Sequence, residues 1–180
     1  MDETELKIRV LGDPVLRKKA KRVLSVSERH RKILSQMARI MYESQGIGLA
    51  APQVGVDESM IVIDIGTGLY KLINPRIVKK QGHQSLEEGC LSCPGVSIKV
   101  KRAKKVFVTA FDENEKKHSI EADNLLACVF QHEIDHLNGK LIVDYASLLK
   151  KLALGKKIRG LSDKEKNEAV HEPETKSAKL

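Results

Sequence analysis

The chain has 180 residues, of which 41% are hydrophobic and 31% are charged, and its formal net charge at pH 7 is +8. This length suits one compact domain with its own core, and no apolar run is long enough to cross a bilayer. The positive charge is accompanied by only 3% aromatic residues and no tryptophan. The chain therefore has few side chains that can stack on nucleic-acid bases, and we expect no specific DNA binding. The start lacks the layout of a secretion signal, which predicts a cytoplasmic protein whose three cysteines are thiols or metal ligands rather than disulfides.

The predicted elements begin with a helix and continue with strands. Ser25 and Glu28 form a capping-box pattern ahead of apolar residues at helical spacing, which predicts a helix over residues 26–44. Short β-rich runs separated by glycine, proline, asparagine or aspartate follow it. They predict strands at residues 60–65, 71–78, 96–100, 105–111 and 118–122.

Helical spacing returns over residues 123–138, where Asp123 is a candidate N-cap and Gly139 follows the predicted end. A last, basic helix is expected over residues 144–158, and the Lys- and Glu-rich residues 161–180 are expected to form a disordered tail. This order predicts an α+β fold with small antiparallel or mixed sheets around a central helix, plus an N-terminal and a C-terminal helix.

The predicted central helix carries the sequence His132-Glu133-Ile134-Asp135-His136, an H-E-x-x-H pattern. Two histidines four residues apart lie on one helix face and can bind one metal ion. In a hydrolase of this kind, the metal lowers the pKa of a bound water towards ~7, and a neighbouring carboxylate such as Glu133 takes its proton. Two surface histidines on a helix are the alternative interpretation.

A catalytic metal site needs a third protein ligand, and the metzincin extension cannot supply it because position 142 is Ile142 instead of histidine. The segment EEGCLSCPG at residues 87–95 offers Cys90 and Cys93. If this segment is extended, residues three apart point to opposite faces, and only one of the two cysteines can reach the metal. Two alternatives stay open: a turn with buried thiols, and a closed structural zinc site made by both cysteines and both histidines. A thioredoxin-like redox pair is less favoured, because no helix pattern follows and Pro94 comes directly after Cys93.

The segment GIGLAAPQ at residues 46–53 imitates the dinucleotide-binding pattern G-x-G-x-x-A. It follows a predicted helix where that pattern requires a strand, and Pro52 obstructs the helix that should begin there. We interpret it as an extended segment that a substrate backbone can approach closely at Gly48, with the Gln53 amide as a hydrogen-bond donor. An ordinary turn into a strand is the simpler alternative.

Three stretches together resemble the signature motifs of the peptide deformylase family, in its order and with its approximate separations: GIGLAAPQ (46–53), EGCLS (88–92) and QHEIDH (131–136). The resemblance extends from LGDPVLR at residues 11–17 to about Tyr145. It implies one catalytic domain over residues 1–160, with the H-E-x-x-H sequence on its central helix. It also implies a metal-dependent hydrolase that removes the N-formyl group from the N-terminal methionine of nascent polypeptides and releases formate.

The resemblance also assigns roles to residues. It implies three metal ligands: Cys90, His132 and His136. The single divalent ion is expected to be Fe²⁺ in the cell, with Zn²⁺, Ni²⁺ or Co²⁺ able to replace it. Glu133 would activate the metal-bound water and later protonate the leaving amine. The metal, the Gln53 amide and the Leu91 backbone N–H would stabilise the developing oxyanion.

The family's pocket for the methionine side chain falls on a further group of residues: Ile47, Leu86, Leu125, Cys128, Val129 and the flank of His132, with Glu88 beside them. On a helix, Leu125, Val129 and His132 share one face, which supports this grouping. Glu88 is also expected to form an ion pair with Arg102. Two positions depart from the family pattern: Cys93, which we expect to be a packing residue, replaces a common aliphatic residue, and Ser97 replaces an arginine of some members.

Two other functions stay open at this point. A zinc peptidase built on the same H-E-x-x-H sequence would cleave internal peptide bonds. A basic nucleic-acid-binding module with a structural zinc site would have no open coordination position and would unfold on chelation. The basic residues of the predicted last helix form either a solvated face or a surface that docks on the ribosome: Lys150, Lys151, Lys156, Lys157 and Arg159.

Overall fold

The computed structural model describes residues 6–147 and 150–151, and residues Met1–Ala146 form one compact unit. The elements of this unit follow in chain order: η1 (Pro14–Arg17), α1 (Glu28–Glu43), β1 (Gly48–Ala50), η2 (Ala51–Val54), β2 (Met60–Ile63), β3 (Tyr70–Gln81), β4 (Gln84–Glu88), β5 (Ile98–Arg102), β6 (Lys105–Phe111), β7 (Lys117–Asp123), α2 (Asn124–Leu137) and η3 (Ile142–Tyr145), where η marks a 3-10 helix. No helix among the described residues is both long and apolar enough to span a membrane.

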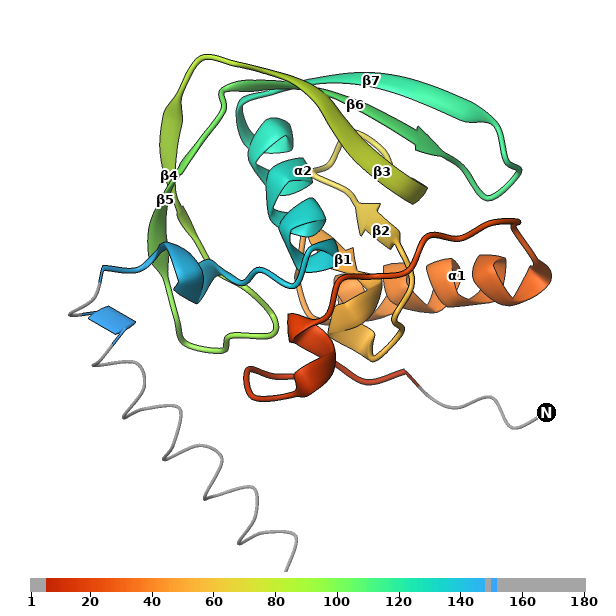
Figure 1. Cartoon of the computed structure of the whole chain (residues 1–180), viewed down its shortest axis with the longest axis horizontal. Helices are drawn as coiled ribbons and strands as arrows, with labels where there is room; N and C mark the ends of the chain where they lie inside the picture. Colours follow the sequence, from red (N-terminus) through yellow and green to blue (C-terminus); the bar gives the residue numbers. More distant parts are fainter. Residues whose placement is uncertain (1–5, 148–149, 152–180) are drawn as a thin grey trace, which may run out of the picture. The chain divides into compact units, whose positions relative to one another are not determined.

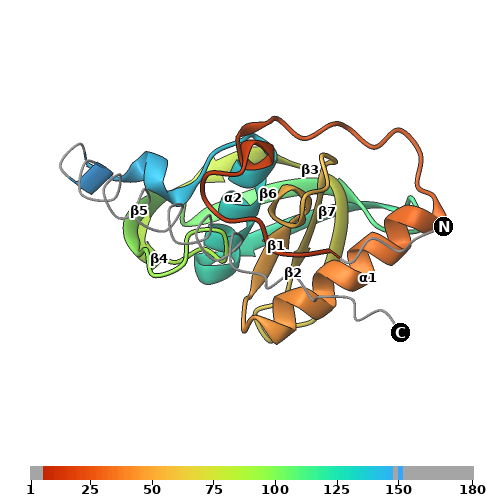
Figure 2. The ribbon, with the colours of Figure 1, turned by 90° about the horizontal axis from the view of Figure 1, so that it is seen from below.

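Five strands form one antiparallel sheet in the order β1-β2-β3-β6-β7, and β4 pairs with β5 in a separate antiparallel ribbon. Strand β2 is fully buried, and its alternate side chains enter two different hydrophobic clusters. Met60 and Val62 pack with α1, whereas Ile61 and Ile63 pack with α2. The two helices therefore cover opposite faces of the sheet, as Figures 1 and 2 show.

Helix α2 lies between the sheet and the β4–β5 ribbon (Figure 1). Its apolar residues Ala127 and Phe130 are fully buried in the sheet-side cluster. The side chain of Gln131 accepts a hydrogen bond from the N–H of Ala103 at 3.0 Å and donates one to its carbonyl at 3.0 Å. This amide ties α2 to the end of β5, and it thereby fixes the helix against the ribbon.

The predicted α+β class is confirmed, and β6 has the predicted bounds. The strands β1 and β4 were not predicted. The predicted cap of the first helix is wrong, because α1 begins after Ser27 and the backbone N–H of Ser27 donates to Nδ1 of His30 at 2.9 Å. The capping pair is therefore Ser27 and His30 instead of Ser25 and Glu28.

The predicted start of the last helix at Asp144 is also wrong. Residues 142–145 form a 3-10 helix that ends in extended backbone at Ala146. The carboxylate of Asp144 accepts a hydrogen bond from the N–H of Leu141 at 2.9 Å, which holds this single turn closed. Residues 150 and 151 are helical. The remainder of the predicted helix and the predicted tail at 161–180 lie outside the described residues.

Candidate metal centre and active site

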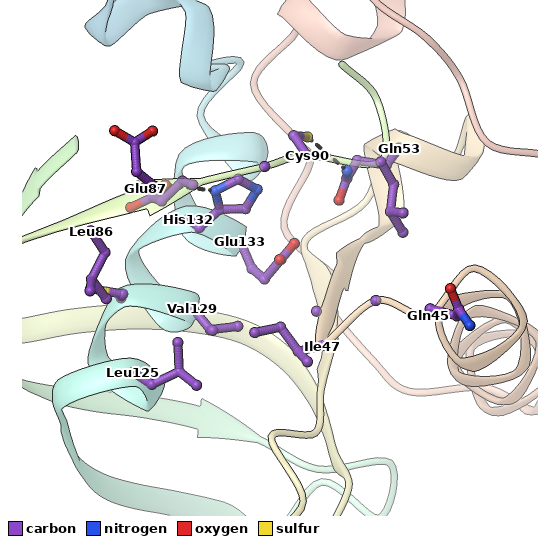
Figure 3. Close-up of a pocket in the computed structure, with 16 residues that line it drawn as sticks. Gln45, Ile47, Gln53, Leu86, Glu87, Cys90, Leu125, Val129, His132 and Glu133 are labelled. Atoms are coloured by element: carbon purple, nitrogen blue, oxygen red, sulfur yellow. Dashed lines mark hydrogen bonds and ion pairs between the residues drawn. The ribbon is translucent and has the colours of Figure 1, made fainter. Parts of the chain in front are cut away.

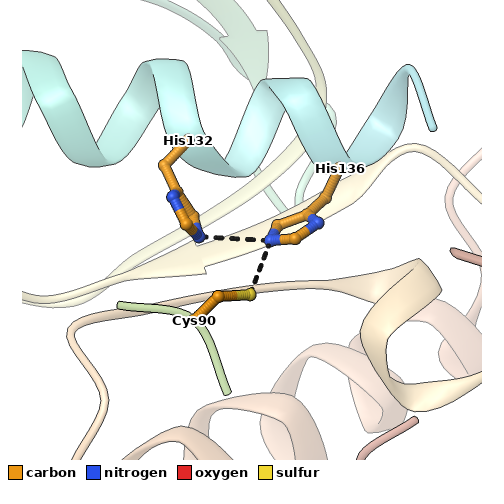
Figure 4. A group of neighbouring side chains, drawn as sticks. All are labelled: Cys90, His132 and His136. Atoms are coloured by element: carbon orange, nitrogen blue, oxygen red, sulfur yellow. Dashed lines mark hydrogen bonds between the residues drawn. The ribbon is translucent and has the colours of Figure 1, made fainter. Parts of the chain in front are cut away.

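Three potential metal ligands from two distant segments converge beside α2, as Figure 4 shows. The Nε2 atoms of His132 and His136 lie 3.2 Å apart, and Sγ of Cys90 lies 3.3 Å from Nε2 of His136. All three ligand atoms lie within 4.8 Å of one another. In the part of the chain that the structure describes, no other group of three or more His, Cys, Asp or Glu residues meets this condition.

These atoms fit a divalent transition-metal ion. With metal–nitrogen bonds of about 2.05 Å and metal–sulfur bonds of about 2.3 Å, a tetrahedral ion separates two nitrogen ligands by about 3.3 Å and a nitrogen from a sulfur by about 3.5 Å. These values are close to the 3.2 Å between the two histidines and the 3.3 Å between Cys90 and His136. Burial strongly lowers the pKa of His136, so its ring is neutral, as a ligand must be. Its buried Nδ1 has no hydrogen-bond partner, so that atom can keep the ring proton and leave Nε2 to a metal.

Residues 90–93 form a turn, which is one of the alternatives left open, so the condition that the segment is extended is not met. The backbone N–H of Cys93 donates to the carbonyl of Cys90 at 2.9 Å. Cys93 is 1% exposed and is not part of the ligand group, so a closed site with two cysteines is absent from the described residues. The neighbouring Cys93 thiol raises the pKa of Cys90, which burial raises further, and the neighbouring Cys90 thiol lowers the pKa of Cys93.

A buried hydrogen-bond network orients His132 from the ribbon. Nδ1 of His132 lies 2.9 Å from Glu88, whose two carboxylate oxygens accept hydrogen bonds from Arg102 at 2.8 and 2.9 Å. Arg102 also binds Asp135, which accepts a hydrogen bond from the Tyr145 hydroxyl at 2.7 Å. Burial favours the neutral form of Glu88, but the hydrogen bonds from Arg102 and His132 outweigh it and lower its pKa. The ionised Glu88 thus fixes the ring so that Nε2 of His132 faces Cys90 and His136.

Glu133 lies on α2 between the two histidines and faces β1. It is 3% exposed, its Oε2 has no hydrogen-bond partner, and burial raises its pKa to about 7. A Cβ atom at Gly48 would come within 2.9 Å of both Cδ of Glu133 and Cγ1 of Val129. Only a glycine as residue 48 therefore leaves room for the Glu133 carboxylate where it lies in the structure.

The 3-10 turn η2 positions the amide of Gln53. Its Oε1 accepts a hydrogen bond from the N–H of Ala50 at 2.8 Å, which turns the amide nitrogen away from η2. That nitrogen lies 3.5 Å from Sγ of Cys90 and 3.2 Å from Oγ of Ser92, and the first of these contacts is drawn in Figure 3. Gln53 is 1% exposed, so the structure places a preoriented N–H donor beside the sulfur.

A cavity of about 470 Å³ opens beside these groups (Figure 3). Ile47, Leu125 and Val129 gather in one part of it, and Cys90 and Glu133 lie in another. All the predicted catalytic and pocket residues line this cavity. Of the three metal-ligand candidates, Cys90 and His132 also line it, whereas His136 does not. Its lining consists of Gln45, Gly46, Ile47, Gly48, Gln53, Leu86, Glu87, Glu88, Gly89, Cys90, Leu91, Leu125, Cys128, Val129, His132 and Glu133.

Sequence reasoning missed some residues of the site. Gln45, Gly46, Glu87 and Gly89 line the cavity without a predicted role, and their only signal was that they adjoin or lie within the motif segments. The partners of Arg102 in α2 and η3 were missed too: Asp135 and Tyr145. Asp135 lies inside the sequence QHEIDH, but Tyr145 has no local signal, because only the folded chain brings it to the ribbon.

Comparison with known proteins agrees with the site. The family model described as polypeptide deformylase matches residues 5–152. The peptide deformylase of Halothermothrix orenii is 50% identical over 141 residues, which cover 77% of this chain and 92% of that protein. The peptide deformylase of Thermoanaerobacter pseudethanolicus is 52% identical over 139 residues, which cover 77% of this chain and 87% of that protein.

The fold of this chain also matches solved structures. A crystal structure of a peptide deformylase from Legionella pneumophila superposes with a TM-score of 0.83 at 43% identity, and the match covers 93% of this chain and 99% of that one. The crystal structure of the peptide deformylase from Thermotoga maritima gives a TM-score of 0.78 at 42% identity, with 81% and 99% covered. The chain therefore belongs to the peptide deformylase family, the metal-dependent hydrolases that remove the N-formyl group from nascent polypeptides.

Proposed function

We propose that deformylation takes place in the cavity beside α2, with Glu133 as the proton carrier. Cys90, His132 and His136 would hold the divalent metal ion beside this cavity. One observation carries the proposal. A buried carboxylate with an unpaired oxygen adjoins three convergent ligand atoms, in a cavity whose wall also has an apolar part.

The ion, when bound, supplies Lewis acidity, which polarises the formyl oxygen and lowers the pKa of a bound water. One sulfur and two imidazoles suit Fe²⁺, Co²⁺, Ni²⁺ and Zn²⁺. We propose Fe²⁺ as the ion in the cell, as the resemblance to the family implies. Metal analysis of protein purified without oxygen tests this: we expect about one iron per chain, and protein that contains only zinc would contradict the assignment.

Glu133 would take one proton from the attacking water and give it to the amine nitrogen that leaves. A carboxyl whose pKa is about 7 can both accept and donate a proton near neutral pH. The Gln53 amide and the Leu91 backbone N–H would donate hydrogen bonds to the formyl oxygen as negative charge develops on it. The products are formate and a free N-terminal amine.

The apolar part of the cavity would take the methionine side chain. Its wall is built from the predicted pocket residues Ile47, Leu86, Leu125, Cys128 and Val129, with Glu88 and the flank of His132 beside them. Ile47 and Leu125 are 43% and 46% exposed, so their side chains are accessible to a ligand in the cavity. The chemistry of this part of the wall therefore favours an apolar side chain.

A substrate series tests this assignment. Metal-loaded protein is mixed with formyl-Met-Ala-Ser, formyl-Asp-Ala-Ser and acetyl-Met-Ala-Ser, and the released formate or acetate is measured. We expect rapid release from formyl-Met-Ala-Ser alone, because an aspartate would enter the apolar wall unpaired. Equal rates for the methionine and aspartate peptides would reject the pocket.

We also propose that the protein binds the ribosome and acts in the cytoplasm, since formylated chains emerge from the ribosome into the cytoplasm. The proposed docking surface comprises Lys150, Lys151, Lys156, Lys157 and Arg159; the first two are exposed, and the other three lie outside the described residues. Replacement of all five by glutamine should weaken co-sedimentation with ribosomes and flatten its dependence on salt. Unchanged co-sedimentation at every salt concentration would reject this partner.

A further inference from the structure

Cys90 and Cys93 occupy the first and last positions of one hydrogen-bonded turn. The N–H of Cys93 donates to the carbonyl of Cys90 at 2.9 Å. Such a turn brings the first and last Cα atoms within about 7 Å of each other. A disulfide spans Cα separations of about 4.4–6.8 Å, so the turn already has a backbone that such a bond can bridge.

The sulfur of Cys90 has two alternative sets of partners. On one side it faces Nε2 of His136 at 3.3 Å and the amide nitrogen of Gln53 at 3.5 Å. The second potential partner is Cys93, at the other end of the same hydrogen-bonded turn. A sulfur that is bonded to another sulfur has lost the charge with which a thiolate binds a metal ion. The two states of Cys90 therefore exclude each other.

We propose that Cys90 and Cys93 form a reversible redox pair, in which a peroxide converts the two thiols to a disulfide and removes the sulfur ligand from the metal site. The formation of the bond follows from the geometry of the turn alone. Its effect on metal binding rests on the proposed function, which gives Cys90 the role of a ligand.

Burial decides the order of the steps. Cys90 is partly exposed and lines the cavity, whereas Cys93 is 1% exposed, so a small peroxide meets Cys90 first. The thiol of Cys90 reduces hydrogen peroxide and becomes a sulfenic acid, with release of one water. The sulfur of Cys93 then attacks the sulfenic sulfur and forms the S–S bond, and the hydroxyl leaves with the thiol proton of Cys93 as a second water. The two thiols supply the two electrons that the peroxide takes up.

Cys128 provides an internal reference for this chemistry. It is buried on α2, and the side chain of Gln84 lies 3.2 Å from its sulfur. A disulfide between Cys90 and Cys93 leaves this third thiol free. Alkylation of Cys128 under denaturing conditions after peroxide treatment therefore separates a specific reaction of the pair from general oxidation.

The test uses the full chain in metal-loaded and metal-depleted form, treated with hydrogen peroxide, denatured, alkylated and analysed by mass spectrometry. We expect the metal-depleted wild type to lose two alkylation sites, to become lighter by about 2 Da before alkylation, and to regain both thiols with a phosphine reductant. We expect the oxidised protein to bind no Ni²⁺ until it is reduced. Metal-loaded protein should react more slowly, because the ion occupies the sulfur of Cys90.

Two variants, Cys93→Val and Cys93→Ala, each remove the second thiol. If one of them fails to fold, the other still tests the proposal. In both, we expect Cys90 to proceed to the sulfinic acid, with a mass gain of about 32 Da that the phosphine does not reverse. The proposal is wrong if Cys93 stays open to alkylation after Cys90 has been oxidised in the wild type. It is also wrong if the variants recover as completely as the wild type. Neither readout depends on deformylase activity, so a failure here is distinct from a failure of the proposed function.

Discussion

Gly48 and Glu133 share one small volume, and this crowding links a residue without a side chain to the proton carrier. The carboxylate of Glu133 occupies the space where a Cβ of residue 48 would stand. From sequence alone, Gly48 could be assigned only as a place of close approach for a substrate. The structure adds a second reason for the glycine, which is the approach of a carboxylate from another element.

Replacement of Gly48 by alanine should displace the Glu133 carboxylate and lower kcat/KM by about 100-fold or more, since small displacements of a catalytic group have costs of this size. Metal content should stay at the wild-type value, because no proposed metal ligand is touched. Steady-state kinetics with a formyl-methionyl peptide and metal analysis of the same sample check both expectations. Wild-type kinetics in a folded variant would show that the position of Glu133 does not matter.

The metal-ligand candidates show how far sequence reaches at this scale. The helical spacing of His132 and His136 predicts a shared face by itself. The choice between Cys90 and Cys93 could not be made from spacing, because spacing does not show whether the segment is extended or forms the turn that the structure has. Only the resemblance to the family singled out Cys90, which is the cysteine that the folded chain brings to both histidines.

At the scale of elements, Arg102 joins four of them. It extends from β5 and binds Glu88 on β4, Asp135 on α2 and Tyr145 on η3. The arginine side chain is 4% exposed and that of Glu88 is 9% exposed, so these charges depend on each other for their stability. The network therefore holds the ribbon, the central helix and the turn after it in one arrangement.

Replacement of Arg102 by leucine should lower the free energy of unfolding by about 3–5 kcal/mol, because Glu88 and Asp135 would lose their positive partner inside the protein. The matched change, Tyr145→Phe, removes one hydroxyl at the edge of the network and should cost about 1 kcal/mol. Urea unfolding of the three proteins measures both values. Equal stability of the leucine variant and the wild type would show that the network is not needed for the fold.

Elements were predictable where their periodicity is long and uninterrupted. Residues 105–111 form a run rich in valine and phenylalanine, and the predicted strand has the bounds of β6. Strand β1 has three residues, and β4 has the sequence QSLEE, so neither has the apolar pattern of a strand. Both owe their conformation to pairing with β2 and β5, which a local pattern does not contain.

For the molecule as a whole, the hydrophobic core lies apart from the metal-ligand candidates. The two hydrophobic clusters cover both faces of the sheet, and neither contains Cys90, His132 or His136. The α+β class could be predicted from the order of helix, strands and helix, because each helix needs an apolar surface to cover. The arrangement of the site could not be read from this order, since the site joins segments that only the folded chain brings together.

Removal of the metal should therefore abolish formate release while the chain stays folded. We expect far-UV circular dichroism at 25 °C to be unchanged after chelation, with a lower thermal midpoint because a ligand of the native state has been lost. Activity should return when Fe²⁺ or Ni²⁺ is added under anaerobic conditions. A chain that unfolds on chelation would instead have the structural zinc site of a binding module.

The central claim is that Glu133 carries the proton during hydrolysis, and formate release by Glu133→Gln tests it most directly. Glutamine keeps the shape of the side chain but cannot take a proton, so the account predicts a folded variant with the metal content of the wild type. Its kcat for formyl-Met-Ala-Ser should be lower by at least about 100-fold, the lower end of the range for general acid–base catalysis. Formate release at the wild-type rate by this metal-loaded variant would contradict the account.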